Sequence, residues 1–162
     1  MKPSTFKRKI NWYPPYLGTG IRVIRVASDF RTIDVEMRLR WYNRNTIGTH
    51  FGGNLSTMID PFYMLILMNI LGRDYVVWDQ SVTIDFLKPG RGRVKAHFHI
   101  PQSRVDEITA ATTDGSKYRP TFEVNIIDED NEIVARAKKT LYIRRKQRDP
   151  QQQNTLKEEA LS

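Results

Sequence analysis

The chain has 162 residues, of which 40% are hydrophobic and 27% charged, a composition typical of one globular domain with its own core. It contains no cysteine, which excludes disulfides, zinc–cysteine sites and thiol nucleophiles and fits a cytoplasmic location. The formal net charge of +8 favours an anionic partner, and nucleic acid, acidic lipid and the phosphates of a coenzyme are all open alternatives.

No apolar segment follows the basic N-terminus, so we expect no signal peptide. The longest apolar run, residues 61–71, is well short of the roughly 20 residues that a membrane span needs. The sequence therefore predicts a buried helix there rather than a membrane span.

The first forty residues predict a short helix and a pair of strands. The helix is expected over residues 4–12, and the segment 12–18, with Pro14 and Pro15, is expected to break it. Residues 20–27 are rich in β-branched side chains, and residues 33–39 alternate strictly between apolar and polar. Such alternation predicts a half-buried strand, paired here with its predecessor across a turn at Ser28-Asp29.

A polar loop over residues 43–49 leads into the most apolar part of the chain. Residues 52–72 contain few β-branched side chains and end at Gly72, as helices often do. Because this segment is apolar on nearly all sides, it predicts a buried central helix. Pro61 should kink that helix, since proline lacks the amide donor and crowds the preceding turn.

The remaining residues predict four more strands and one short helix. The strands fall near residues 82–86, 94–100, 122–126 and 133–144, and the helix over residues 103–113. The predicted fold class is α+β, in which an antiparallel sheet wraps around one long central helix in a single domain over residues 1–146. The polar tail 147–162 is expected to be disordered.

The start of the central helix carries the most suggestive chemistry. Gly52 and Gly53 leave the first-turn N–H groups accessible, and these groups can polarise a carbonyl oxygen as it gains negative charge. Asp60 is a carboxylate in an apolar helix, where burial should raise its pKa and suit it to act as a general base. The amide of Asn45 can bind water or substrate. The same pattern also suits an ordinary turn before a helix, with Asp60 bonded to backbone that Pro61 leaves free.

The spacing of these residues has a consequence for assembly. Seven residues of helix separate Gly53 from Asp60, which is about 10 Å at roughly 1.5 Å per residue. A site that uses both would need a second subunit, with two such helices side by side in a symmetric dimer.

The run Asn45-x5-Phe51-Gly52-Gly53-x6-Asp60 resembles the PaaI-like branch of the hotdog-fold thioesterases, which carries Asn-x5-His-Gly-Gly-x6-Asp or Glu. Residues 13–18, 48–53, 86–92 and 140–144 are similar to a hotdog family of unassigned function. The resemblance implies a hotdog fold, a homodimer that can pair into a tetramer, an acyl-CoA or acyl-carrier thioester as substrate, and no cofactor.

The resemblance also implies roles for individual residues. The Gly53 amide would bind the thioester oxygen, Asp60 of the partner subunit would activate water or attack directly, and Asn45 would position substrate or water. Asp79, on the following strand, matches a polar residue that often assists. The family's histidine is Phe51 here.

Further substrate contacts are expected around this motif. His50 lies one place before the family's histidine position, and His50, Phe51 and Gly52 are therefore candidates for contact with the substrate. Arg91 and Arg93 are expected to hold the phosphates of coenzyme A.

Two other functions remain open. The replacement of histidine by Phe51 motivates a non-catalytic acyl-CoA or lipid-binding module. Charge and aromatic residues alone motivate a nucleic-acid or membrane-surface binder, but no recognition motif supports it, so we expect no nucleic acid partner. His97 and His99 share a strand face without a third ligand, and no metal site is predicted.

Overall fold

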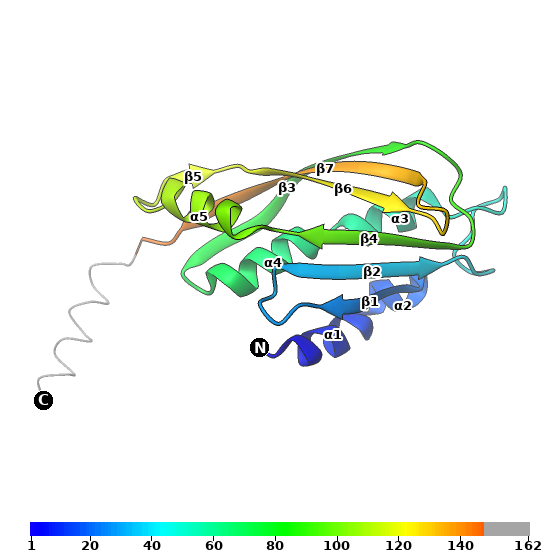
Figure 1. Ribbon diagram of the computed structural model, residues 1–162, viewed down its shortest axis with the longest axis horizontal. Helices are drawn as coiled ribbons and strands as arrows, with labels where there is room; N and C mark the ends of the chain where they lie inside the picture. The colour runs from blue at the N-terminus through cyan, green and yellow to red at the C-terminus, as the bar shows by residue number, and fades with distance from the viewer. Residues whose placement is uncertain (148–162) are drawn as a thin grey trace, which may run out of the picture.

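Seven strands form one antiparallel sheet that wraps around a helical segment, as Figure 1 shows for the computed structural model of residues 1–147. The predicted disordered tail lies, apart from residue 147, outside the described residues. The strand order is β1-β2-β4-β6-β7-β3, and β5 also pairs with β7. The strands are β1 (Ile21–Val26), β2 (Thr32–Arg38), β3 (Tyr75–Phe86), β4 (Arg93–His99), β5 (Lys117–Tyr118), β6 (Thr121–Ile127) and β7 (Ile133–Arg145).

Alternating side chains divide each central strand between core and solvent. In β2, Ile33, Val35 and Met37 are fully buried, as their alternation with polar residues predicts. The neighbouring strand β4, which pairs with β2, buries Val94, Ala96 and Phe98 in the same way. Burial of these aliphatic and aromatic side chains is the main source of stability for the sheet.

The predicted central helix is two helices, α3 (Gly52–Ile59) and α4 (Phe62–Leu71), separated at Asp60 and Pro61. This break confirms the kink expected at Pro61. Phe62, Ile66 and Leu67 are fully buried, and α4 contacts β2, β3 and β4. By length and composition alone, Gly52–Leu71 would also suit a membrane span. Its packing identifies it as the core helix of the sheet.

The N-terminal residues form two helices, α1 (Pro3–Asn11) and α2 (Pro14–Thr19), which lie beside β1. The first helix ends before the prolines, as expected. The prolines do not end helical structure, however, because residues 14–19 form a second helix that the sequence analysis did not predict. Pro14 and Pro15 occupy the first helical positions, where an N–H group has no acceptor within the helix, so their missing donors cost nothing. The remaining helix, α5 (Gln102–Ala111), agrees with its prediction.

Strand β3 begins earlier than its sequence pattern indicates. It starts at Tyr75, and a bulge lies between Asp79 and Ser81 in its pairing with β7. A bulge adds one residue to one strand and so changes which residues face the core. The alternation of residues 82–86 therefore does not continue into residues 75–79, which explains why this half of the strand was not predicted.

Candidate active site

The start of α3 presents two backbone amides that donate no hydrogen bond to any described residue. They belong to Gly52 and Gly53, and the first-turn bonds that do form run from the amides of Asn54 and Leu55 to the carbonyl of Phe51. These free donors lie at the positive end of the helix dipole and suit an oxygen that carries negative charge.

Aromatic rings occupy the space that side chains at these glycines would need. A Cβ atom added to Gly53 would lie 2.4 Å from Cε1 of Phe51, and one added to Gly52 would lie 3.3 Å from Cζ of Phe86. Gly53 is therefore required by the position of the Phe51 ring, which folds over the first turn of α3.

A pocket of ≈ 340 Å³ lies beside the start of α3. It lies between the loop that precedes the helix and the turn that follows β3. Its lining includes Asn45, His50, Gly52, Leu55, Phe86 and Gly90. Three of the predicted site residues, Asn45, His50 and Gly52, therefore line one pocket, and Gly52 also provides a free helix amide there.

Asn45 shapes the loop that forms one wall of this pocket. Its side-chain oxygen accepts hydrogen bonds from the amides of Ile47 (3.1 Å) and Thr49 (3.0 Å). Its side-chain nitrogen donates to the Thr49 hydroxyl at 2.9 Å and to the His50 carbonyl at 3.4 Å. Both oxygen lone pairs and both N–H groups are thus used within the loop, as in an Asx turn.

His50 is buried against the turn that follows β3. Its Nε2 atom lies 3.1 Å from the carbonyl oxygen of Gly92, and since a carbonyl only accepts, Nε2 carries the proton. Its Nδ1 atom is buried and has no hydrogen-bond partner among the described residues. Burial lowers the pKa of His50, although the bond to Gly92 opposes this effect, and the ring is therefore neutral near pH 7.

Asp60 lies at the break between α3 and α4, and its side chain is 65% exposed. The expectation that an apolar helix would bury this carboxylate is wrong for the single chain. The kink at Pro61 ends α3 at this residue and turns the carboxylate toward the edge of the core, where solvent reaches it.

Asp60 meets a lysine that the sequence analysis did not identify. Nζ of Lys139 lies 3.1 Å from Oδ1 of Asp60 and 3.0 Å from Oδ2 of Asp79, and the lysine side chain is only 1% exposed. Asp60 lies at the helix break, Asp79 on β3 and Lys139 on β7. We call Asp60, Asp79 and Lys139 the inner charge cluster. A period-2 pattern could have indicated the lysine, because Ala137 and Leu141 on either side of it face the core.

Burial determines the ionisation of the groups around this cluster. It raises the pKa of Asp79, while the hydrogen bond and charge of Lys139 lower it and the charge of Asp60 raises it further. Burial also raises the pKa of the Tyr16 hydroxyl, with additional contributions from Asp60 and Asp79. The Tyr16 hydroxyl and Oδ1 of Asp79 are both buried without a hydrogen-bond partner among the described residues.

The two predicted arginines differ in their availability. Arg93 lies 3.8 Å from Glu36 and 3.9 Å from Glu129, so its charge is already compensated. Arg91 is exposed in the turn next to the pocket and makes no ion pair within residues 1–147. Of the two, Arg91 is the one free to meet an anionic group.

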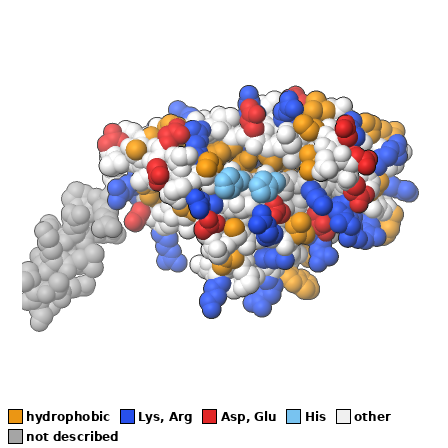
Figure 2. Space-filling model, in the orientation of Figure 1, with side chains coloured by type: hydrophobic (Ala, Val, Ile, Leu, Met, Phe, Trp, Pro, Cys, Tyr) orange, Lys and Arg blue, Asp and Glu red, His pale blue; other side chains and the backbone are white. Residues whose placement is uncertain are grey.

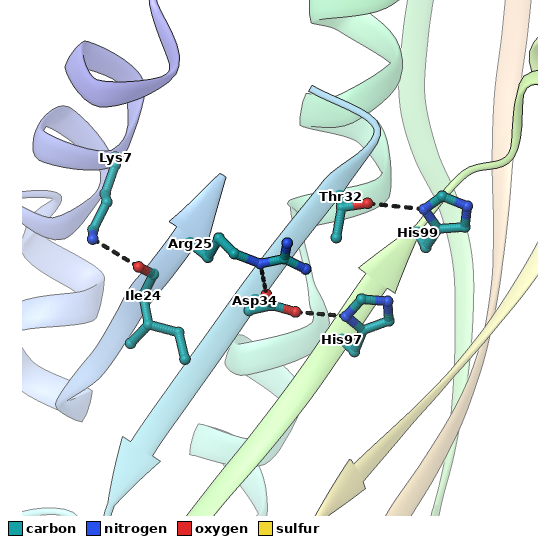
Figure 3. A network of polar contacts seen from close by, with 7 residues as sticks. All are labelled: Lys7, Ile24, Arg25, Thr32, Asp34, His97 and His99. Atoms are coloured by element: carbon teal, nitrogen blue, oxygen red, sulfur yellow. Dashed lines mark hydrogen bonds and ion pairs between the residues drawn. The ribbon is translucent and has the colours of Figure 1, made fainter. Parts of the chain in front are cut away.

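The outer face of the sheet carries a second group of charges, and two histidines lie near its centre in Figure 2. Asp34 forms an ion pair with Arg25 and lies 2.5 Å from Nδ1 of His97, whereas His99 bonds to the hydroxyl of Thr32 at 2.9 Å (Figure 3). We call Arg25, Asp34 and His97 the outer charge cluster. No group of three metal-ligating side chains occurs within the described part of the chain.

The structure thus divides the predicted site residues between two places in one chain. Asn45, His50, Phe51, Gly52 and Gly53 lie around the start of α3, whereas Asp60 and Asp79 lie in the inner charge cluster. Arg91 is adjacent to the first place, and Arg93 is bound to acidic neighbours.

Comparison with known proteins gives a family and a fold for this chain. A family model described as a domain of unknown function, DUF4442, matches residues 3–143. The chain belongs to the DUF4442 family. No curated protein matches the chain.

Solved structures show that this DUF4442 protein has the hotdog fold. It is similar to PA5026 of Pseudomonas aeruginosa, a protein of unknown function described as a probable thioesterase, with a TM-score of 0.80 and 16% identity over 90% of this chain and 97% of that one. It is also similar to the thioesterase HI1161 of Haemophilus influenzae, with a TM-score of 0.65 and 14% identity over 88% and 90% of the two chains. At these identities the likeness shows the fold alone.

Proposed function

We propose that this DUF4442 protein is an acyl-CoA or acyl-carrier thioesterase that works as a homodimer, in the cytoplasm and without a cofactor. The observation that carries the proposal is the pair of free amides at Gly52 and Gly53 at the start of the core helix, where Gly52 lines a pocket. Thioesterase-type neighbours with the same fold support it.

The reaction needs an acceptor for negative charge and a base. The thioester carbonyl oxygen accepts hydrogen bonds from the Gly53 region, which stabilises the oxyanion that forms when water attacks the carbonyl carbon. The Asp60 carboxylate takes a proton from that water. The carbon–sulfur bond then breaks, the thiolate leaves, and it recovers the proton to give a free acid and a thiol. Asn45 shapes the pocket wall, and Arg91 meets the phosphates of coenzyme A.

The distance along the helix supports a dimer. Gly53 and Asp60 lie about 10 Å apart along the chain's own helix, at roughly 1.5 Å per residue. Strand β3 is at one end of the sheet order, and its side chains Trp78, Val82 and Phe86 are about half exposed. Pairing of two such edges would cover these side chains and bring Asp60 of one subunit toward Gly53 of the other. The free outer face of the sheet leaves room for a dimer of dimers.

The proposal is tested with a panel of acyl-CoAs of increasing chain length. Thiol release is followed for the wild type, for Asp60→Asn and for Asp106→Asn, which alters an exposed aspartate of α5 as a control. We expect turnover by the wild type and the control, and a loss of at least about 100-fold in Asp60→Asn, as for removal of a general base.

The position of the Phe51 ring over Gly53 favours one alternative, a non-catalytic acyl-CoA-binding protein. Binding of the same panel, measured by calorimetry, separates the two functions. Tight binding without turnover of any chain length would contradict the thioesterase proposal and support the binding protein.

A further inference from the structure

Lys139 occupies a position in the fold that a lysine seldom takes. It lies on the core face of β7, between Ala137 and Leu141, and the residue is fully buried. Lysine is almost never fully buried unless it is paired, because moving an ammonium group out of water is costly. A hydrophobic residue would fill this place at a lower cost, so the charge itself calls for an explanation.

The lysine links three parts of the chain that are far apart in sequence. Its Nζ contacts the carboxylates of Asp60 (3.1 Å) at the helix break and of Asp79 (3.0 Å) on β3. Two of its three N–H donors are therefore directed at acids. Lys139 is therefore the cation that the two carboxyl groups of this cluster share.

The surroundings of the cluster contain unused polar atoms. Oδ1 of Asp79 is a buried acceptor without a donor, and the Tyr16 hydroxyl is a buried donor without an acceptor. Tyr16 is 2% exposed, and the raised pKa of its hydroxyl, due first to burial, keeps it protonated. Buried polar atoms are usually paired, and exceptions tend to occur at functional sites. These two atoms lie around the carboxylates that Lys139 holds.

We propose that Lys139 is a positioning residue of the active site, which holds the Asp60 carboxylate at the helix break so that it can take a proton from the attacking water. This inference rests on the proposed thioesterase function. Lys139 itself, buried behind the two carboxylates, acts through Asp60.

The test measures kcat and KM separately for the wild type, Lys139→Met and Lys139→Arg. Loss of the contact that holds the Asp60 carboxylate should lower kcat of Lys139→Met by about tenfold, while KM stays within about twofold because no substrate contact is removed. Lys139→Arg should recover most of kcat because it keeps a charged donor beside the carboxylate.

Lys138→Met is the matched control. Lys138 is the next residue on β7, faces solvent and pairs with Glu123 on the surface. We expect its kcat and KM to match those of the wild type. A kcat of Lys139→Met that falls only in proportion to the folded fraction, with no recovery in Lys139→Arg, would show a purely structural role and overturn the proposal.

A second measurement keeps the inference separate from the enzymatic activity. Crystal structures of the wild type and of Lys139→Met compare the position of the Asp60 carboxylate without any substrate. A displaced or disordered Asp60 carboxylate in Lys139→Met supports the proposal, and an unchanged carboxylate overturns it. If the wild type hydrolyses no thioester, the function fails while this comparison still decides whether Lys139 holds Asp60. Should Lys139→Met fail to fold, Asp79→Asn/Lys139→Met removes both inner charges and takes its place.

Discussion

The two charge clusters of this protein contain similar groups, but the pKa of a partly buried aspartate is lowered in one and raised in the other. In the outer charge cluster, one acid, Asp34, meets Arg25 and His97 on the solvent-facing side of the sheet. In the inner charge cluster, two acids share one lysine that is 1% exposed. The first has a surplus of potential cations, which are exposed, and the second has a surplus of carboxyl groups around a buried cation.

The pKa values of the acids follow this difference. Burial raises the pKa of Asp34, but the hydrogen bonds and charges of Arg25 and His97 outweigh it, and the net effect is a lowered pKa. For Asp79, burial is again the largest effect, and one shared lysine does not outweigh it, so the pKa is raised. The ionised carboxylate of Asp34 therefore stabilises the fold. Ionisation of Asp79 lowers the stability of the fold, and a functional role explains why the acid is kept there.

The largest expected effect comes from removing Lys139 from the inner charge cluster, and removing Arg25 from the outer charge cluster gives the comparison. Lys139→Ala should destabilise the protein by about 3 kcal/mol at pH 7, the lower end of the range for breaking a buried ion pair, because Asp60 can still be solvated. Arg25→Ala should cost less than about 1 kcal/mol, as for an exposed pair. Urea denaturation of both variants measures the difference, and equal losses would contradict the distinction between the clusters.

A smaller effect is expected from Asp79→Asn, and it depends on pH. The folded-state pKa of Asp79 is raised above its ordinary value of 3.8, so the folded state holds this proton more tightly than the unfolded state. The contribution of Asp79 to stability is therefore greatest near pH 4 and is lost as the pH rises through the folded pKa. The melting temperature of Asp79→Asn, relative to the wild type, should increase from pH 4 to pH 8. A constant difference would show that Asp79 ionises normally.

The smallest effect, with the opposite sign, is expected from Asp34→Asn. The folded-state pKa of Asp34 is lowered below 3.8, so its contribution is present above that pH and is lost as the pH falls through the folded pKa. Asp34→Asn should cost less than about 1 kcal/mol at pH 7, with a deficit that shrinks toward pH 3. Melting curves at several pH values test this, and a deficit that grows on acidification would refute the assignment.

Much of the fold could be predicted from local patterns. The alternation over Ile33–Leu39 gave a strand, and the proline within an apolar segment gave the kinked core helix, because each depends on neighbours in sequence. The start of β3 could not be predicted, since its bulge interrupts the alternation. The helix α2 was missed because proline was read as a breaker rather than as a first helical residue.

The candidate site was predictable only in part. The glycines at the helix start were identified from their spacing, but whether Asp60 is buried depends on which way the kink turns it. The contact of Asp60 with Lys139 spans 79 positions, and no local pattern encodes it. The lysine could have been noticed on the apolar side of β7, although its partners could not.

The bulge in β3 changes whether odd-numbered or even-numbered residues of the strand face the core. Asp79 lies opposite Leu141, and beyond the bulge Ile84 lies opposite Ala137, so the acid and the hydrophobic residue face the same side although they are five positions apart in sequence. Deletion of Gln80 would shorten this separation to four positions, at which a regular strand directs both side chains inward without a bulge. A relative one residue shorter here can therefore keep the charged centre, whereas a relative two residues shorter would turn either the acid or the hydrophobic residue toward solvent.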